Sequence, residues 1–167
     1  MGQVRADSTR VDGRHLLRHA LATIAYRGCR VVLDAPAPFA QFRSGPSTRT
    51  PAEILAHLGD LMDWALTAAQ GAPAWRSADP LPWPAEVDRF FAALGRFDAY
   101  LAGDAALGWP AERLLQAPIA DALTHIGQLA MLRRLAGAPV RGERFSEARI
   151  EVGHVGRDQP PPRAPFD

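Results

Sequence analysis

Two residues that can bind metal ions, Asp121 and His125, stand four apart within residues 118–137, a stretch that is apolar nearly throughout. In a helix, this spacing places the two side chains one turn above each other on the same side. Thr124 and Gln128 fall within the same arc of about 100°. One interpretation is that this arc is the solvent face of an ordinary amphipathic helix.

The residues that continue the same line favour a second interpretation, in which the arc is buried. Leu132 and Leu135 stand where a solvent face would usually carry charge. A buried carboxylate and a buried imidazole must be paired or must hold a metal ion, because leaving them unsatisfied costs several kcal/mol. We therefore expect Asp121 and His125 either to be paired or to hold a metal ion.

Three further histidines have side chains that can bind a metal ion, and their positions distinguish them. His57 lies at the edge of the apolar face of its helix, where a hydrogen-bonded structural role is the commoner one. If Asp121 and His125 face His57 across the core, the three residues can share one metal ion, since helical bundles build metal sites from facing helices. His15 and His19 are also four apart, but they point away from the apolar stripe of their own helix, which predicts surface positions.

Hydrophobic periodicity predicts an all-α fold, a four-helix bundle with helices at about 12–32, 51–70, 84–102 and 118–136. Thr50 and Glu53 form a capping-box pattern around Pro51, and Pro118 is expected to begin the last helix. Long, proline-rich connections follow the first two helices. Trp75 and Trp83 both lie in the second of these connections, where they would cover one end of the bundle or line a pocket.

The chain is expected to form one domain, residues 1–167, with an irregular, proline-rich tail at 141–167 that holds a short strand at 149–155. The charged residues of the third helix, Glu86 and Asp98 among them, are expected to be solvated, and Asp60 to point outward. Apolar residues on the connections would fit a homodimer, although no helix face is clearly left over for one.

Composition excludes several functions. Nineteen basic and eighteen acidic residues nearly cancel, so no strong field favours nucleic acid or a membrane surface. The absence of a signal peptide and of a long apolar run predicts a cytoplasmic protein. Cys29 is the sole cysteine, which rules out an intramolecular disulfide, and it is expected to be a partly buried free thiol. No lysine is present to act in catalysis.

The histidine of the second helix and the run THIGQLAMLRRLAG in the last one resemble the DinB-like superfamily of metal-binding four-helix bundles, which includes YfiT-like and bacillithiol- or mycothiol-dependent enzymes. The resemblance covers residues 14–142. It implies a divalent ion bound by His57 and His125. A third histidine usually stands four residues before the latter, and here that position is Asp121. The carboxylate favours iron, manganese or nickel more than three imidazoles would, with zinc still possible.

This resemblance implies an enzyme that acts on a small-molecule substrate. Three protein ligands leave the ion open positions to activate water or a low-molecular-weight thiol, as in a thiol transferase or a hydrolase. Gln128 and His154 are the candidate catalytic residues, Gln128 because it lies one turn beyond His125 and His154 because the tail could cover the site. The alternative is a non-catalytic bundle that binds a metal or a small molecule in a stress response.

Overall fold

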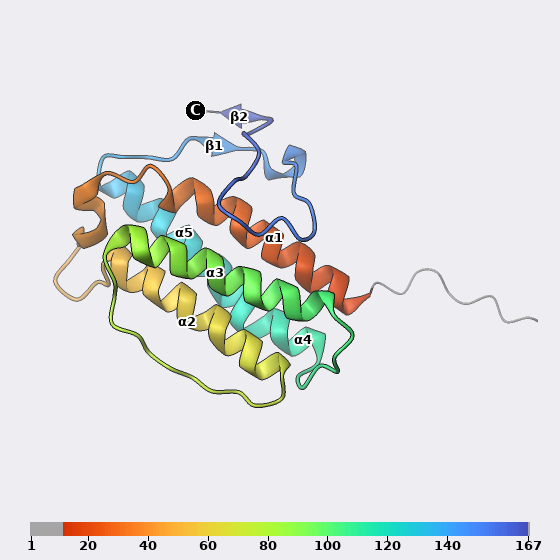
Figure 1. Cartoon of the computed structure of the whole chain (residues 1–167). Coiled ribbons are helices and arrows are strands. Elements are labelled where there is room, and N and C mark those ends of the chain that lie inside the picture. The colour runs from red at the N-terminus through yellow and green to blue at the C-terminus, as the bar shows by residue number, and fades with distance from the viewer. Residues whose placement is uncertain (1–11, 167) are drawn as a thin grey trace, which may run out of the picture.

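The computed structural model describes residues 12–166, and within them four long helices pack side by side around the core (Figure 1). They are α1 (Gly13–Val32), α2 (Pro51–Ala69), α3 (Trp83–Ala102) and α5 (Ala120–Leu135). α1 and α2 each pack against both α3 and α5. The chain is therefore mostly helical, as predicted, and the boundaries of α1, α2 and α3 agree with the expected ones to within one residue.

One continuous hydrophobic core joins the four long helices. The predicted stripe of α1 is buried along its whole length, from Leu17 through Gly28 to Val31. The start of α2 is fixed by the capping box, in which the Thr50 hydroxyl accepts from the Glu53 N–H and the Glu53 carboxylate accepts from the Thr50 N–H. Since this cap sets the register of α2, it also sets which face carries His57.

Pro118 does not begin the last helix. The helical segment starts earlier, with α4 (Ala111–Leu114), and passes through a π-helical turn, η2 (Leu115–Ile119), into α5. Pro118 lies inside η2 and is buried. A proline has no N–H for an ordinary helical hydrogen bond, and a single π turn lets the helix continue past that gap. Asp121 therefore lies in the first turn of α5, directly after this irregularity.

The segment after α5 contains little regular structure. It has two antiparallel strands of two residues, β1 (Gly142–Glu143) and β2 (Pro165–Phe166), and the 3₁₀ turn η3 (Phe145–Glu147). A separate 3₁₀ turn, η1 (Ala37–Gln41), lies earlier in the chain, after α1. The strand expected at 149–155 is wrong, because these residues form loops and turns. Arg157 pairs with Asp88, which ties the segment to α3.

Three acidic side chains expected to be solvated are buried. Glu86 is fully buried, and Asp60 and Asp98 are 7% and 6% exposed. Arg18 pairs with Asp98 at 2.9 Å, and Arg89 pairs with both Asp60 and Glu86. Gly59 provides the space for this arginine, since a Cβ at that position would lie 2.9 Å from Arg89 Nη2. A buried carboxylate is tolerated when a cation and hydrogen bonds satisfy it.

These buried carboxylates also hold the long connection between α2 and α3. Asp60 accepts a hydrogen bond from the Ala78 N–H at 3.1 Å, and Glu86 accepts one from the Leu81 N–H at 2.8 Å. The loop at residues 70–82 is therefore anchored at two backbone positions. Trp75, which lies within this loop, is positioned against α2 by these contacts.

Cys29 is buried, and its Sγ donates to the Tyr26 carbonyl oxygen at 3.1 Å. Burial raises the pKa of this thiol to about 11. We expect the folded protein at pH 7 to be nearly inert to a thiol-specific disulfide reagent, and to react fully once it is unfolded in denaturant, because only the thiolate attacks. Fast stoichiometric labelling of the native protein would show that Cys29 is exposed and ionised.

No helix within residues 12–166 is both long and apolar enough to cross a membrane.

Candidate metal centre

The side chains of His57, Asp121 and His125 converge between α2 and α5. Asp121 Oδ2 lies 3.4 Å from His57 Nε2, and Asp121 Oδ1 lies 3.3 Å from His125 Nδ1. One ligand atom from each residue lies within 4.8 Å of the other two. Ligands about 2.1 Å from a tetrahedral ion are themselves roughly 3.4 Å apart. The separation of His57 Nε2 and Asp121 Oδ2 matches this spacing, and two imidazoles and a carboxylate are a donor set that suits a divalent cation.

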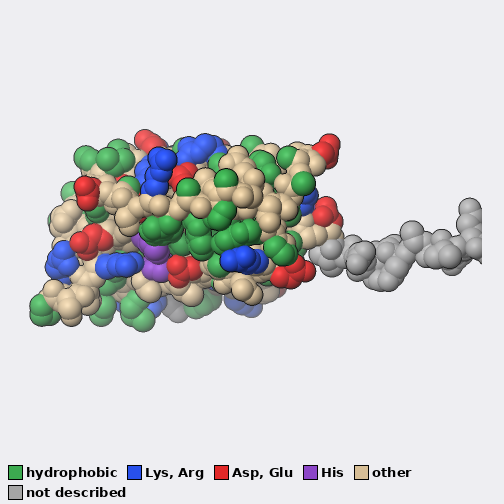
Figure 2. All heavy atoms as spheres, turned by 90° about the horizontal axis from the view of Figure 1, so that it is seen from below, with side chains coloured by type: hydrophobic (Ala, Val, Ile, Leu, Met, Phe, Trp, Pro, Cys, Tyr) green, Lys and Arg blue, Asp and Glu red, His purple; other side chains and the backbone are tan. Residues whose placement is uncertain are grey.

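The site is more open than the sequence suggested. The side chains of His57 and His125 are 19% and 11% exposed, whereas that of Asp121 is 44% exposed. Leu135, whose apolar side chain favours a buried arc, is itself 56% exposed. The polar arc of α5 therefore opens to solvent. Figure 2 shows histidine side chains reaching the surface beside hydrophobic ones on this side of the molecule.

The His125 ring is oriented by its own helix. Its Nδ1 lies 2.9 Å from the main-chain oxygen of Asp121, the residue one turn earlier. An imidazole that donates Nδ1–H to a carbonyl carries its lone pair on Nε2, which leaves that nitrogen free to bind a metal. Thr124 is exposed, and its hydroxyl donates to the same carbonyl at 2.7 Å, the back-bonding expected of a helical threonine.

The surroundings of His57 favour the neutral form of its imidazole. Burial lowers its pKa from the ordinary value, and the nearby His125 and Arg49 lower it further, while Asp121 opposes the shift. The His57 and His125 rings have centroids 4.6 Å apart. Because a metal binds only neutral imidazole, an environment that disfavours protonation of His57 favours coordination.

An aromatic row begins at the site. Trp75 packs edge-on against His57 with ring centroids 5.5 Å apart, and Trp64 lies 5.8 Å from Trp75. Trp109 continues the row at 5.5 Å from Trp64. Trp75, expected to cover one end of the bundle or to line a pocket, lies against His57 of α2 and is 47% exposed. Trp83 lies elsewhere, against Phe39, and donates its indole N–H to the Val32 carbonyl.

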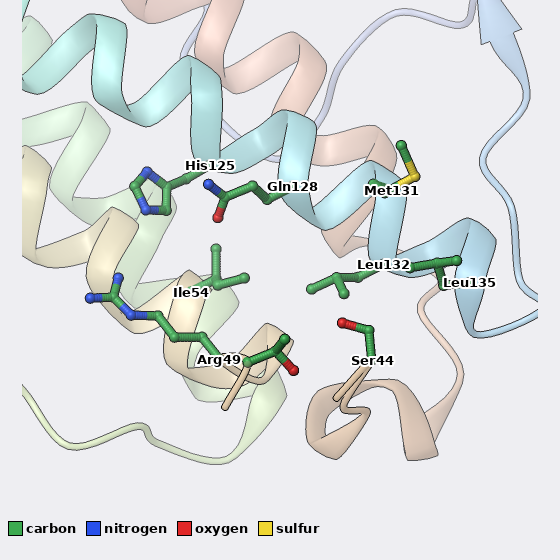
Figure 3. Close-up of a pocket in the computed structure, with 9 residues that line it drawn as sticks. Ser44, Arg49, Ile54, His125, Gln128, Met131, Leu132 and Leu135 are labelled. Carbon is green, nitrogen blue, oxygen red and sulfur yellow. The ribbon is translucent and has the colours of Figure 1, made fainter. Parts of the chain in front are cut away.

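A cavity of about 450 Å³ lies beside His125 (Figure 3). Gln128 lines it one turn further along α5, and its amide points into the space between α5 and the start of α2. Ile54 and Leu132 provide apolar walls, and Arg49 lies on the side of His125. A small molecule in this cavity would therefore lie beside His125 of the candidate metal centre.

The remaining sequence candidates lie elsewhere. His154 is exposed on the C-terminal segment, where its Nε2 faces the Asp158 carbonyl oxygen, and its neighbour Gly153 lies near Arg18 of α1. The structure does not bring His154 to the three ligands. His15 and His19 are exposed on α1, as their spacing relative to the apolar stripe predicted.

Sequence reasoning missed Arg49 as part of the site. Arg49 directly precedes the N-cap residue Thr50, so the capping box that fixes the start of α2 also brings this cation to the cavity. A basic residue next to a well-marked helix start is the signal that could have revealed it.

Trp75 should report metal binding. We expect Ni²⁺ or Co²⁺ at the centre to quench part of the tryptophan emission, because the Trp75 ring lies 5.5 Å from the His57 ring. Trp75→Phe should abolish most of this quenching. Trp83→Phe, which changes an indole packed against Phe39 instead, should retain it. Equal quenching in both variants would place the ion away from His57.

No protein-family model matches this sequence, and comparisons with curated proteins and with solved structures find no significant match.

Proposed function

We propose that this protein is a metal-dependent enzyme with a DinB-like four-helix bundle, in which His57, Asp121 and His125 hold one divalent ion. The observation that carries the proposal is the convergence of these three ligand atoms within 4.8 Å of one another, from two different helices. The packing of α1 and α2 against both α3 and α5 supports the proposal.

The open side of the centre supports catalysis over the non-catalytic alternative. A non-catalytic bundle that only holds a metal would be expected to fill the space around the ligands, whereas a cavity of about 450 Å³ lies beside His125. A bound ion would lower the pKa of a thiol or water in its open position, which supplies a nucleophile at neutral pH. Thiol transfer to an electrophile and hydrolysis are the two reactions that this chemistry serves.

The protein's own groups have separate roles in this proposal. The Asp121 carbonyl orients the His125 ring, and the Asp121 carboxylate contributes negative charge to the centre. The Gln128 amide is placed to hydrogen-bond a substrate or the attacking group within the cavity. Ile54 and Leu132 exclude water from the apolar part of the substrate.

The test is an assay of metal-loaded protein with low-molecular-weight thiols, bacillithiol and mycothiol among them, and an electrophilic acceptor, together with an ester-hydrolysis assay. We expect one of these reactions to be at least about 100-fold slower in His57→Ala. General acid–base catalysis and activation of a nucleophile by a metal ion each contribute rate factors of at least this order. Gln128→Ala should retain the ion and still lose rate. Equal rates in wild type and His57→Ala would contradict the proposal.

A further inference from the structure

A second cavity, of about 270 Å³, lies between α1, α5 and the C-terminal segment, away from the three metal ligands. Its walls are largely apolar, with Leu123, Ile126 and Ala130 from α5 and Phe145 and Phe166 from the C-terminal segment. Four arginines also line it, namely Arg27, Arg30, Arg134 and Arg141. Positive charge is thus concentrated at one apolar cavity in a chain whose formal net charge is only +1.

Two of these arginines differ from the other buried or half-buried ones. Residues 12–166 contain six such arginines. Arg18 and Arg89 pair with buried carboxylates, and Arg14 and Arg133 each donate to three main-chain carbonyls, so these four have well-defined partners. The two exceptions are Arg27 and Arg30, and both line the same cavity.

The partners of Arg27 and Arg30 are few. The Nε atoms of both are buried without a hydrogen-bond partner. Among the described residues Arg27 makes no hydrogen bond or ion pair, and its guanidinium lies 4.0 Å from the centre of the Phe145 ring. Arg30 donates to the Pro160 carbonyl and lies over the Tyr26 ring. Partly desolvated guanidinium groups without an anion are costly, which points to a missing acceptor.

Among residues 12–166, Glu143 is the one carboxylate that lines this cavity, and its hydrogen bonds go to other groups. Glu143 accepts from the Tyr26 hydroxyl at 2.8 Å and from the Arg163 N–H at 3.1 Å. The position of Arg27 and Arg30 near the C-terminal end of α1 favours basic residues through the helix dipole, but it provides no hydrogen-bond acceptor. An anion within the cavity would provide one.

We propose that this cavity binds a small amphipathic carboxylate, with its carboxylate at Arg27 and Arg30 and its hydrocarbon part against the apolar face of α5. The guanidinium fork matches a carboxylate in two parallel hydrogen bonds, and the apolar lining excludes a fully hydrated anion. A water molecule takes up about 30 Å³ in the liquid, so the cavity has room for a ligand of roughly nine non-hydrogen atoms. Octanoate has about this size and is the probe of choice.

The first test is a calorimetric titration of the full-length protein with octanoate, 1-octanol and inorganic phosphate. Octanoate is expected to bind at one saturable site, and more tightly than either of the other two compounds. An octanol affinity equal to that of octanoate would overturn the proposal, because the arginines would then contribute nothing. Tighter binding of phosphate would overturn the assignment to an amphipathic ligand.

Variants locate the binding site. Arg27→Gln should weaken octanoate binding at least about ten-fold, the effect of losing one charge-assisted hydrogen bond. Arg113→Gln is the matched control, because the Arg113 guanidinium also lies on an aromatic ring, 3.8 Å from the centre of Trp109, but outside this cavity. Equal losses in the two variants would show that the effect of Arg27 is not specific.

Two further variants test whether the cavity itself is the binding site and whether binding is independent of the metal centre. Ala130→Phe fills the cavity from α5 without removing charge and should abolish octanoate binding. His57→Ala removes a proposed metal ligand and should leave octanoate binding unchanged. Binding that survives Ala130→Phe, or that disappears in His57→Ala, would contradict a separate carboxylate site.

Discussion

Arg89→Ala is expected to destabilise the protein by roughly 3–5 kcal/mol, the usual effect of leaving buried charge without its partner. Arg89 is the cation that the fully buried Glu86 and the nearly buried Asp60 share. Its removal leaves both carboxylates uncompensated between α2 and α3. Native domains are stable by only about 5–15 kcal/mol, so this loss should be evident in the midpoint of urea-induced unfolding.

Arg96→Ala provides the matched control for this measurement. Arg96 lies on the same helix and pairs with Asp63 of α2 at 2.6 Å, but both side chains are about half exposed. Exposed ion pairs contribute about 0–1 kcal/mol, so this variant should unfold close to wild type. Similar destabilisation by the two substitutions would mean that the Asp60 and Glu86 charges are not buried as described.

The same substitution should loosen the connection that carries Trp75. Asp60 and Glu86 accept hydrogen bonds from the backbone at Ala78 and Leu81, and Arg89 holds both carboxylates in place. We therefore expect limited proteolysis within residues 70–82 of Arg89→Ala, at protease concentrations that leave Arg96→Ala intact.

His57→Ala is expected to lower the affinity for a divalent ion by more than about 100-fold. Removing groups that merely orient metal ligands typically costs 10- to 100-fold in affinity, and His57 is a proposed ligand itself. The dissociation constants for Zn²⁺ and Ni²⁺ can be measured by competition with a chromophoric chelator. Because His57 lies at the edge of the core, the metal-free variant should keep a helical circular dichroism spectrum.

His15→Ala is the control for a general effect of histidine removal. His15 is exposed on α1 and belongs to no metal-binding group found among residues 12–166. Its loss should leave the affinity for both ions unchanged. Wild-type affinity in His57→Ala, or equal losses in the two variants, would exclude His57 from the centre.

Much of this arrangement could be predicted from the sequence. The apolar stripe of α1 and the capping box of α2 specify the burial and register of their helices, because both depend on local spacing alone. The spacing of Asp121 and His125 likewise places two potential ligands on one face of α5. That His57 would meet them across the core was a hypothesis, and the structure brings the three together.

Features that depend on tertiary partners could not be predicted in this way. The helical period gives the direction of Glu86 and Asp98 but does not reveal that Arg89 and Arg18 will neutralise them inside the protein. Leu135 looked like a core residue because it is apolar, yet it lines the rim of a cavity. Pro118 looked like a helix start, since a π turn that accommodates a proline has no simple sequence signature.

The most direct test of the metal centre is anomalous X-ray scattering from a crystal of the protein loaded with zinc, recorded on both sides of the zinc absorption edge. We predict one strong peak within about 2.3 Å of a His57 nitrogen, a His125 nitrogen and an Asp121 carboxylate oxygen. A zinc peak bound by other residues, or none between α2 and α5 at full zinc loading, would contradict the proposed centre.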